Sequence, residues 1–140
     1  MKIVIDSSVW IAGIGSKTGY ANQIIDASYK NVDIEIYISS HILDEVALNL
    51  EKKLKFDRSL AIHARQIVKN LCDFEIDINA KEENQVGAIN YKPDKPILAL
   101  CEKIRADYLI TFDRKHLLNL KKYGRTQIIE PKNFAKIIIG

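Results

Sequence analysis

Short β-branched runs alternate with helix-forming segments along the whole chain, and this alternation restricts the fold more than any other feature of the sequence. The runs predict strands at 2–5, 35–39, 74–78, 108–111 and 127–129. Apolar residues at helical spacing predict helices at 20–29, 40–55, 57–71, 94–105 and from Pro131 onward, with helical turns within 81–93 and at 116–120. Strands separated by helices build βαβ units, so we expect an α/β protein with three α/β/α layers and a mainly parallel central sheet.

The composition is that of an ordinary soluble domain. A length of 140 residues with 47% hydrophobic content fits a single domain over 1–140, and a net charge of +3 is compatible with a polyanionic partner. Cys72 and Cys101 lack zinc-ligand spacing and lie among apolar neighbours, which predicts buried, reduced thiols. Asp6 interrupts the first apolar run, and no run approaches the roughly 20 residues of a membrane span. We expect a cytoplasmic protein with no membrane partner.

Two acids follow predicted strands directly. Asp6 comes after the strand 2–5, and Asp113 follows the strand 108–111 after one intervening residue. The carboxyl ends of parallel strands meet at one edge of an open sheet, and the functional crevice lies there. We therefore expect both side chains at the same edge.

Two more acids lie near the starts of predicted helices. Glu45 is in the second turn of the helix 40–55, and Asp94 begins the helix 94–105 above its apolar face. Each acid alone also fits a structural role, since Asp6, Asp94 and Asp113 suit caps or turns. Glu45 suits a solvated helix position, where Asp44 competes with it. Their coincidence at one edge of the sheet favours a common site.

Carboxylates gathered at one edge repel one another unless a cation lies among them. A ligand set made only of oxygen favours magnesium or manganese over zinc. One or two such ions can activate water and stabilise the leaving oxygen in phosphodiester hydrolysis. The sequence therefore predicts a phosphodiesterase site whose metal-binding and catalytic residues are Asp6, Glu45, Asp94 and Asp113.

The segments that carry these acids resemble the motifs of the PIN domain family. The opening segment 1–11 is similar to the family's first strand and acidic motif, and 39–46 resembles its second acidic motif. Segment 94–99 is similar to the third, an Asp leading into an apolar helix. Segment 106–113, Ala-Asp-Tyr-Leu-Ile-Thr-Phe-Asp, matches the last acidic motif and is the most specific of them. The segment 129–134 resembles the closing strand and proline-initiated helix, so the resemblance covers essentially the whole chain.

This resemblance implies a Mg²⁺- or Mn²⁺-dependent endoribonuclease. Such an enzyme would be either the toxin of a VapBC-type toxin–antitoxin pair or a stand-alone RNA-processing nuclease. It also implies a homodimer, an antitoxin partner in the toxin case, and supporting hydroxyls at Ser8 and Thr111. Phe112 departs from the Gly or Asn of many relatives, and Lys115 and His116 stand where several relatives have a further carboxylate. One-metal chemistry would therefore fit as well as two-metal chemistry.

Basic and aromatic residues supply candidates for RNA contact. The basic run after Asp113 is either a phosphate track or a solvated helix face, and comprises Arg114, Lys115, His116, Lys121, Lys122 and Arg125. A second basic cluster is predicted to be solvated surface and comprises Lys52, Lys53, Lys55 and Arg58. The aromatic residues predicted in the core are Trp10, Phe74, Phe112 and Phe134, whereas Tyr20 and Tyr91 suit base stacking better.

Two other functions remain as alternatives. A PIN-like module with weak catalysis could bind RNA or protein, although the presence of all four acids argues against a degraded site. A receiver-type phosphate-signalling domain is disfavoured because the strand 35–39 ends in serines and no matching lysine follows. The absence of a Gly-rich phosphate loop excludes P-loop hydrolysis of nucleoside triphosphates.

Overall fold

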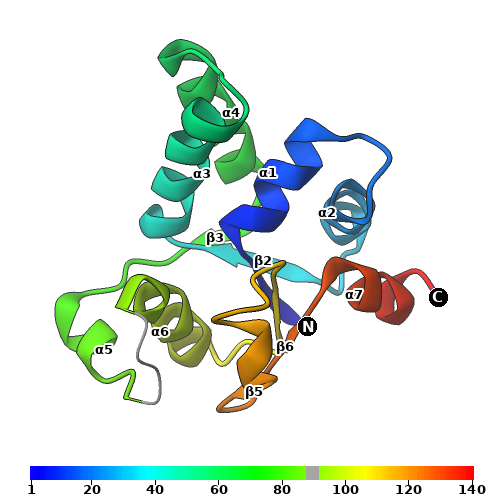
Figure 1. Cartoon of the computed structure of the whole chain (residues 1–140). Coiled ribbons are helices and arrows are strands. Elements are labelled where there is room, and N and C mark those ends of the chain that lie inside the picture. The colour runs from blue at the N-terminus through cyan, green and yellow to red at the C-terminus, as the bar shows by residue number, and fades with distance from the viewer. Residues whose placement is uncertain (88–91) are drawn as a thin grey trace.

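Strands and helices alternate throughout the protein, in a computed structural model that describes residues 1–87 and 92–140 (Figure 1). In chain order the elements, with η marking a 3-10 turn, are β1 (Lys2–Ile5), α1 (Ser7–Gly15), α2 (Tyr20–Lys30), β2 (Glu35–Ile38), α3 (Ser40–Lys53), α4 (Arg58–Leu71), β3 (Phe74–Glu75), α5 (Ala80–Asn84), η1 (Lys92–Asp94), α6 (Lys95–Ile104), β4 (Tyr108–Ile110), η2 (Leu118–Leu120), β5 (Lys122–Tyr123), β6 (Thr126–Ile129) and α7 (Pro131–Ile138). Tyr91, a candidate for base stacking, lies outside the described residues.

The strands of the described residues form a six-stranded sheet in the order β3-β2-β1-β4-β6-β5. Neighbouring strands pair in parallel except β5 and β6, which are antiparallel. Figure 1 shows α1, α3 and α4 on one side of the strands and α5 and α6 on the other, while α2 packs against α7. The predicted three-layer α/β/α architecture with a mainly parallel sheet is therefore confirmed.

The central strand β1 explains why the sheet is covered on both faces. Ile3, Val4 and Ile5 are all fully buried, so side chains on both faces of this strand lack contact with water. A continuous apolar run of this kind is typical of a parallel strand with helices on either side. The amide of Asp6 donates to the carbonyl of Ile110 at 2.9 Å, which joins the end of β1 to the end of β4.

Helix α1 was not expected, because its sequence has no polar face. Val9, Trp10 and Ile11 are consecutive and all buried, so the segment lacks the polar intervals that reveal a surface helix. The indole of Trp10 donates to the carbonyl of Ile5 at 3.0 Å and so ties the helix to β1. The chain therefore turns into a helix directly after Asp6.

The edges of the sheet also differ from expectation. Strand β3 has two residues rather than the predicted five, and β5 was not predicted at all. β5 and β6 form a hairpin whose turn contains Gly124 at φ +58°, a conformation that glycine adopts without strain. Such short edge strands carry too few residues to show a period in the sequence.

The apolar stripe of α4 is only partly buried. Ala64 and Val68 are in the core, whereas Leu60 and Ile67 are 47% and 48% exposed. These exposed residues border an apolar groove of about 370 Å³ that also contacts α1 and α2. None of the helices formed by the described residues is long and apolar enough to cross a membrane.

The core prediction for the aromatic residues is correct for two and wrong for two. Trp10 and Phe134 are buried, but Phe74 and Phe112 are 45% and 42% exposed. Phe74 lies at the sheet edge and stacks on Tyr37, with ring centroids 5.0 Å apart. Phe112 follows β4 beyond the end of the strand, where helices no longer cover the chain.

Both cysteines are free thiols, as predicted. Cys101 is buried and Cys72 is half-buried. Burial raises the pKa of Cys72 to about 12, and it raises the pKa of Cys101 as well. Both side chains are therefore protonated at neutral pH and contribute as small apolar groups.

Candidate functional site

The four predicted acids line one cavity at the carboxyl edge of the sheet. Asp6 follows β1 and Asp113 follows the adjacent parallel strand β4, while Glu45 comes from α3 and Asp94 from the start of α6. The cavity has a volume of about 380 Å³ and is lined by Asp6, Ser7, Ser8, Glu45, Asn49, Lys53, Pro93, Asp94, Ile97, Phe112, Asp113 and His116. Acids separated by more than 100 residues in the chain are thus brought together by the strand order.

Asp6 is held by two hydroxyls rather than by a helix cap. It occupies the N-cap position of α1, but its side chain makes no capping hydrogen bond. Its Oδ2 instead accepts hydrogen bonds from Thr111 Oγ1 at 2.8 Å and from Ser8 Oγ at 2.9 Å. Asp6 is 8% exposed and Thr111 is fully buried, so these bonds fix the carboxylate at the floor of the cavity. Ser8 and Thr111, predicted as supporting hydroxyls, therefore contact the first acid directly.

Glu45 faces the cavity, and its competitor Asp44 does not. The Asp44 side chain is 72% exposed and pairs with Arg65 at 3.0 Å. Glu45 is half-buried, and its Oε1 accepts a hydrogen bond from Ser7 Oγ at 3.5 Å. Burial first, and then the charge of Asp6, raise the pKa of Glu45 to about 7. The solvated-surface alternative for Glu45 is thus not what the structure shows.

Asp94 precedes α6 without capping it. The residue occupies the N-cap position at φ −90° and ψ −8°, and its side chain makes no capping hydrogen bond. Its Oδ2 is buried and has no hydrogen-bond partner among the described residues. Burial first, then the charges of Asp113 and Asp6, raise the pKa of Asp94 to about 6. His116 acts in the opposite direction and lowers this pKa, but its effect is smaller than that of burial and the neighbouring acids.

Asp113 combines a turn role with a place in the cavity. Its Oδ1 accepts a hydrogen bond from the amide of His116 at 2.9 Å, as a turn-forming aspartate does. Its own amide donates to Thr111 Oγ1 at 3.0 Å, so the same threonine positions both Asp6 and Asp113. Asp113 thus has the turn role that was the structural alternative for it, and its charge also acts on Asp94.

The charge balance of the cavity fits a divalent cation. One carboxylate oxygen is buried without a hydrogen-bond partner among the described residues, and burial together with neighbouring acids raises two pKa values, so the protein compensates the negative charge there only in part. Among the described residues, no three His, Cys, Asp or Glu side chains lie close enough together to surround one ion. The acids thus form an open arrangement of hard oxygen donors. Such an arrangement suits an ion that binds few carboxylates and keeps several waters, as Mg²⁺ does.

Several cavity residues were not predicted from the sequence, among them Asn49 and Lys53 on the helix that carries Glu45. Asn49 and Lys53 lie on α3 four and eight residues after Glu45, so all three occupy one face of the helix. The spacing was available in the sequence, but it gains meaning only once Glu45 is known to face the site. Lys53 was predicted to be solvated surface together with Lys52; it is exposed as expected, and it also borders the cavity.

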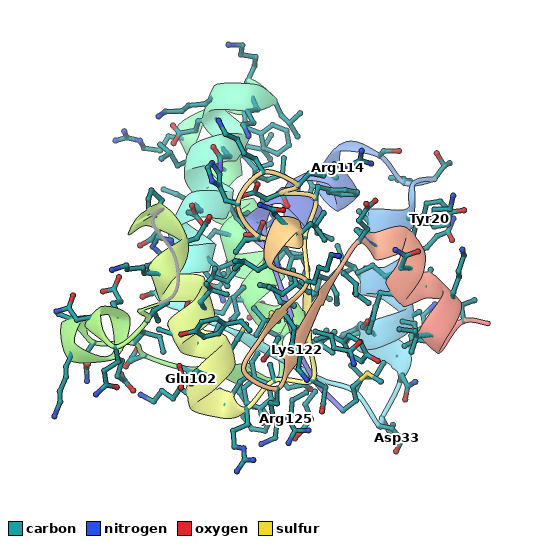
Figure 2. The ribbon with its side chains drawn as sticks, turned by 60° about the horizontal axis from the view of Figure 1, so that its bottom comes forward. Tyr20, Asp33, Glu102, Arg114, Lys122 and Arg125 are labelled. Carbon is teal, nitrogen blue, oxygen red and sulfur yellow. The ribbon has the colours of Figure 1, made fainter. Side chains whose placement is uncertain are left out.

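The basic run after Asp113 does not form one continuous surface. His116 lines the cavity, and Arg114 and Lys115 are exposed beside it. Lys122 instead pairs with Gln127 at the amino end of the sheet, level with the first residue of β4. Figure 2 shows Arg114 in the upper half of the view and Lys122 and Arg125 in the lower half.

The remaining basic residues of the run are engaged elsewhere. Arg125 donates to Asp107 at 2.7 Å, at the amino edge of the sheet. Lys121 is exposed at φ +62°, and its carbonyl accepts from the amide of Ile128 at 2.9 Å in the hairpin. Tyr20, a stacking candidate, is 48% exposed at the start of α2 and is not among the cavity residues.

The sequence profile of the PIN domain family matches residues 2–115. VapC20 from Mycobacterium tuberculosis, a sarcin–ricin loop cleaving toxin, has a similar structure with a TM-score of 0.65 and 18% sequence identity, covering 89% of this chain and 98% of that one. VapBC2 from Rickettsia felis, solved with a DNA fragment from its promoter, gives a TM-score of 0.65 at 18% identity, covering 93% of this chain and 98% of that one. No curated protein matches the sequence.

A mainly parallel sheet with acids at the carboxyl ends of β1 and β4 defines an α/β protein with a polar site at the edge of its sheet. The chain belongs to the PIN domain family.

Proposed function

We propose that the protein is a metal-dependent endoribonuclease that hydrolyses RNA phosphodiester bonds. The observation that carries this proposal is the meeting of four carboxylates from four different elements in one cavity, with Asp94 Oδ2 buried and unpartnered among the described residues. Asp6, Glu45, Asp94 and Asp113 would hold one or two Mg²⁺ or Mn²⁺ ions. When bound, such an ion supplies an activated water and neutralises charge that develops on the phosphate.

The chain's own residues give the acids their order. Ser8 and Thr111 orient Asp6, and Thr111 also orients the backbone of Asp113. Ser7 restrains Glu45 from the first turn of α1. Arg114 and Lys115 place positive charge on the side of the cavity where β4 ends, and we propose that they and His116 contact RNA phosphates.

For biological context we propose two settings for the same chemistry. The likeness to VapC20 and VapBC2 supports the toxin of a VapBC-type pair, with an antitoxin protein as partner. A homodimer remains a prediction from the family resemblance. The PIN domain family match equally supports a stand-alone RNA-processing nuclease of the cytoplasm. The two settings share the site, and they differ in whether a neighbouring reading frame encodes an inhibitor of cleavage.

The test is cleavage of a mixed pool of structured and single-stranded RNA in Mn²⁺, Mg²⁺ or chelator. Wild type is compared with Glu45→Gln and with the matched control Asp44→Asn, one residue away on the solvent side of α3. We expect metal-dependent cleavage that Glu45→Gln abolishes and Asp44→Asn retains. Absence of cleavage by folded wild type in every metal would overturn the nuclease and favour a PIN-like module that only binds RNA or protein.

A further inference from the structure

Phe112 is an exposed aromatic ring at the border of a cavity that is otherwise mostly polar. It is 42% exposed and is among the residues that line the cavity, together with Asp113 and Ser8. Single exposed apolar residues are common on protein surfaces and need no explanation by themselves. What sets Phe112 apart is its position, because a ligand that enters the polar cavity can reach this partly exposed ring.

The backbone that carries Phe112 is held on both sides. Its amide donates to Ser8 Oγ at 3.2 Å. Thr111, which precedes it, is fully buried and donates through its amide to the carbonyl of Ile129 at 3.1 Å. Asp113, which follows it, donates through its amide to Thr111 Oγ1. The ring is therefore presented from a fixed backbone rather than from a loose loop.

Lys53 borders the same cavity from a different element. It lies in the last turn of α3, two helical turns beyond Glu45, and its side chain is exposed. Of the ion pairs formed by the described residues none includes Lys53, whereas Arg58 pairs with Glu51 at 3.8 Å nearby in the chain. The charge of Lys53 acts on Glu45 and lowers the pKa of that acid, and without a short-range ion pair the exposed ammonium group can also bind an anion that enters between α3 and the segment after β4.

We propose that Phe112 stacks on a base and that Lys53 binds a phosphate of the same strand, so that the two residues determine which RNA enters this cavity. The inference rests on the proposed nuclease function and adds to it the residues that select the substrate. Aromatic faces bind all bases by stacking, and a lysine binds the backbone without regard to sequence. The pair therefore selects for an unpaired nucleotide rather than for a base identity.

The size of the cavity also favours an unpaired nucleotide. A volume of about 380 Å³ is at the low end for a small-molecule site and far below the space that a duplex would fill. A base that is paired and stacked in a helix presents no free face to Phe112. A nucleotide from a loop, bulge or end presents that face without the cost of unstacking.

The experiment separates binding from cleavage. A single-stranded RNA carrying 2-aminopurine, and a hairpin with the same nucleotide paired, are titrated with protein in Ca²⁺, and anisotropy and fluorescence quenching are followed. The variants are Phe112→Leu, Phe112→Tyr and the matched control Phe74→Leu, whose ring is equally exposed but stacks on Tyr37 away from the cavity. Thermal unfolding verifies that each variant is folded.

For wild type we expect tighter binding of the single strand and quenching of 2-aminopurine. Phe112→Leu should weaken single-strand binding roughly tenfold, in line with the loss of one stacked base, and abolish the quenching. Phe112→Tyr should retain both signals, and Phe74→Leu should behave as wild type. Unchanged affinity and quenching in Phe112→Leu would overturn the role of Phe112, whether or not the protein cleaves RNA.

Lys53 is tested by Lys53→Gln, Lys53→Arg and the neighbouring control Lys52→Gln. Lys53→Gln should weaken RNA binding several-fold at low salt. It should also reduce the slope of the logarithm of the binding constant against the logarithm of salt concentration by about one. In Mn²⁺ it should raise KM more than it lowers kcat, and Lys53→Arg should restore KM. Equal effects of Lys53→Gln and Lys52→Gln would overturn the specific role of Lys53. Failure of the nuclease function itself would show differently, as absent cleavage with binding and quenching intact.

Discussion

The acids at the two edges of the sheet have pKa values that are shifted in opposite directions. At the amino edge, Asp107 accepts hydrogen bonds from the amide of Lys2 at 2.8 Å and from Arg125 at 2.7 Å. The hydrogen bond from the Lys2 amide is the main cause that lowers the pKa of Asp107, and Arg125 lowers it further. At the carboxyl edge, burial and neighbouring acids raise the pKa of Glu45 to about 7 and that of Asp94 to about 6.

This contrast separates an acid that stabilises the fold from acids that the fold leaves uncompensated. Asp107 is neutralised by groups of the same chain, so its charge contributes to folding. Asp94 is half-buried beside other carboxylates, with its Oδ2 buried, and their repulsion destabilises the metal-free fold. A chain retains such a cost most readily where an external cation or a substrate removes it. The uncompensated edge is therefore the functional one.

The largest expected effect concerns cleavage. Asp6→Asn should lower the cleavage rate in Mn²⁺ by on the order of a thousandfold, the rate equivalent of about 4 kcal/mol of transition-state stabilisation. Asp107→Asn, the same chemical change at the opposite edge, should leave the rate within about twofold. Initial rates on one labelled RNA measure both. Equal losses in the two variants would remove the distinction between the edges.

The next effect concerns stability and runs in the opposite direction. Asp107→Ala leaves the amide of Lys2 and the guanidinium of Arg125 without their acceptor, and should lower the free energy of unfolding by about 1–3 kcal/mol. Asp6→Asn should cost much less in the presence of chelator, because it also relieves repulsion. Urea denaturation at neutral pH measures both free energies. A larger loss for Asp6→Asn would indicate that Asp6 is mainly structural.

A smaller effect is expected for the basic residues. Replacing Arg114 and Lys115 together with glutamine should weaken RNA binding roughly fivefold at low salt, because two phosphate contacts beside the acids are lost. Replacing Lys121 and Lys122 in the same way should change affinity by less than about twofold, since Lys122 lies at the other edge. Anisotropy titrations at two salt concentrations measure both. Similar losses of affinity in the two double variants would mean that RNA also contacts the β5–β6 hairpin.

The smallest effect is a pH-dependent gain in stability. Asp94 has a raised pKa in the folded state, so its ionisation destabilises the metal-free protein fully above about pH 6. The penalty declines as the pH falls from there and is gone only below the ordinary pKa of the carboxyl. Asp94→Asn should therefore raise the melting temperature by a few degrees at most in chelator at pH 7.5, with a smaller gain at pH 5. For Asp107 the sign is reversed, because its stabilisation is lost only in acid, below its ordinary pKa. A loss of stability in Asp94→Asn at both pH values would identify Asp94 as a structural cap.

Most regular elements were predictable because their side chains alternate or repeat with a clear period. The strands β1, β2, β4 and β6 and the helices α2, α3, α4, α6 and α7 lie within one or two residues of their expected positions. Helix α1 was not, since a helix buried on all sides shows no period, and the two-residue strand β5 is too short to show one. The fold class did not depend on these exceptions.

The candidate acids were predictable for a different reason. An acid directly after an apolar strand, such as Asp6, must leave the sheet at the carboxyl edge whatever the rest of the chain does. The choice of Glu45 over Asp44 required the family resemblance, because both lie on the same helix. The structure then places Asp44 beside Arg65 and Glu45 in the cavity.

The amino-acid sequence by itself determined the layered α/β architecture, the parallel sheet and the set of acids at one edge, because hydrophobic period and strand ends are local properties. Only the tertiary structure decided the surroundings of that edge. It placed Lys53 and Phe112 at the cavity and moved Lys122 and Arg125 to the opposite edge. Whether a charged or aromatic side chain faces a site depends on which elements pack beside it, and that is set by contacts between residues far apart in the chain.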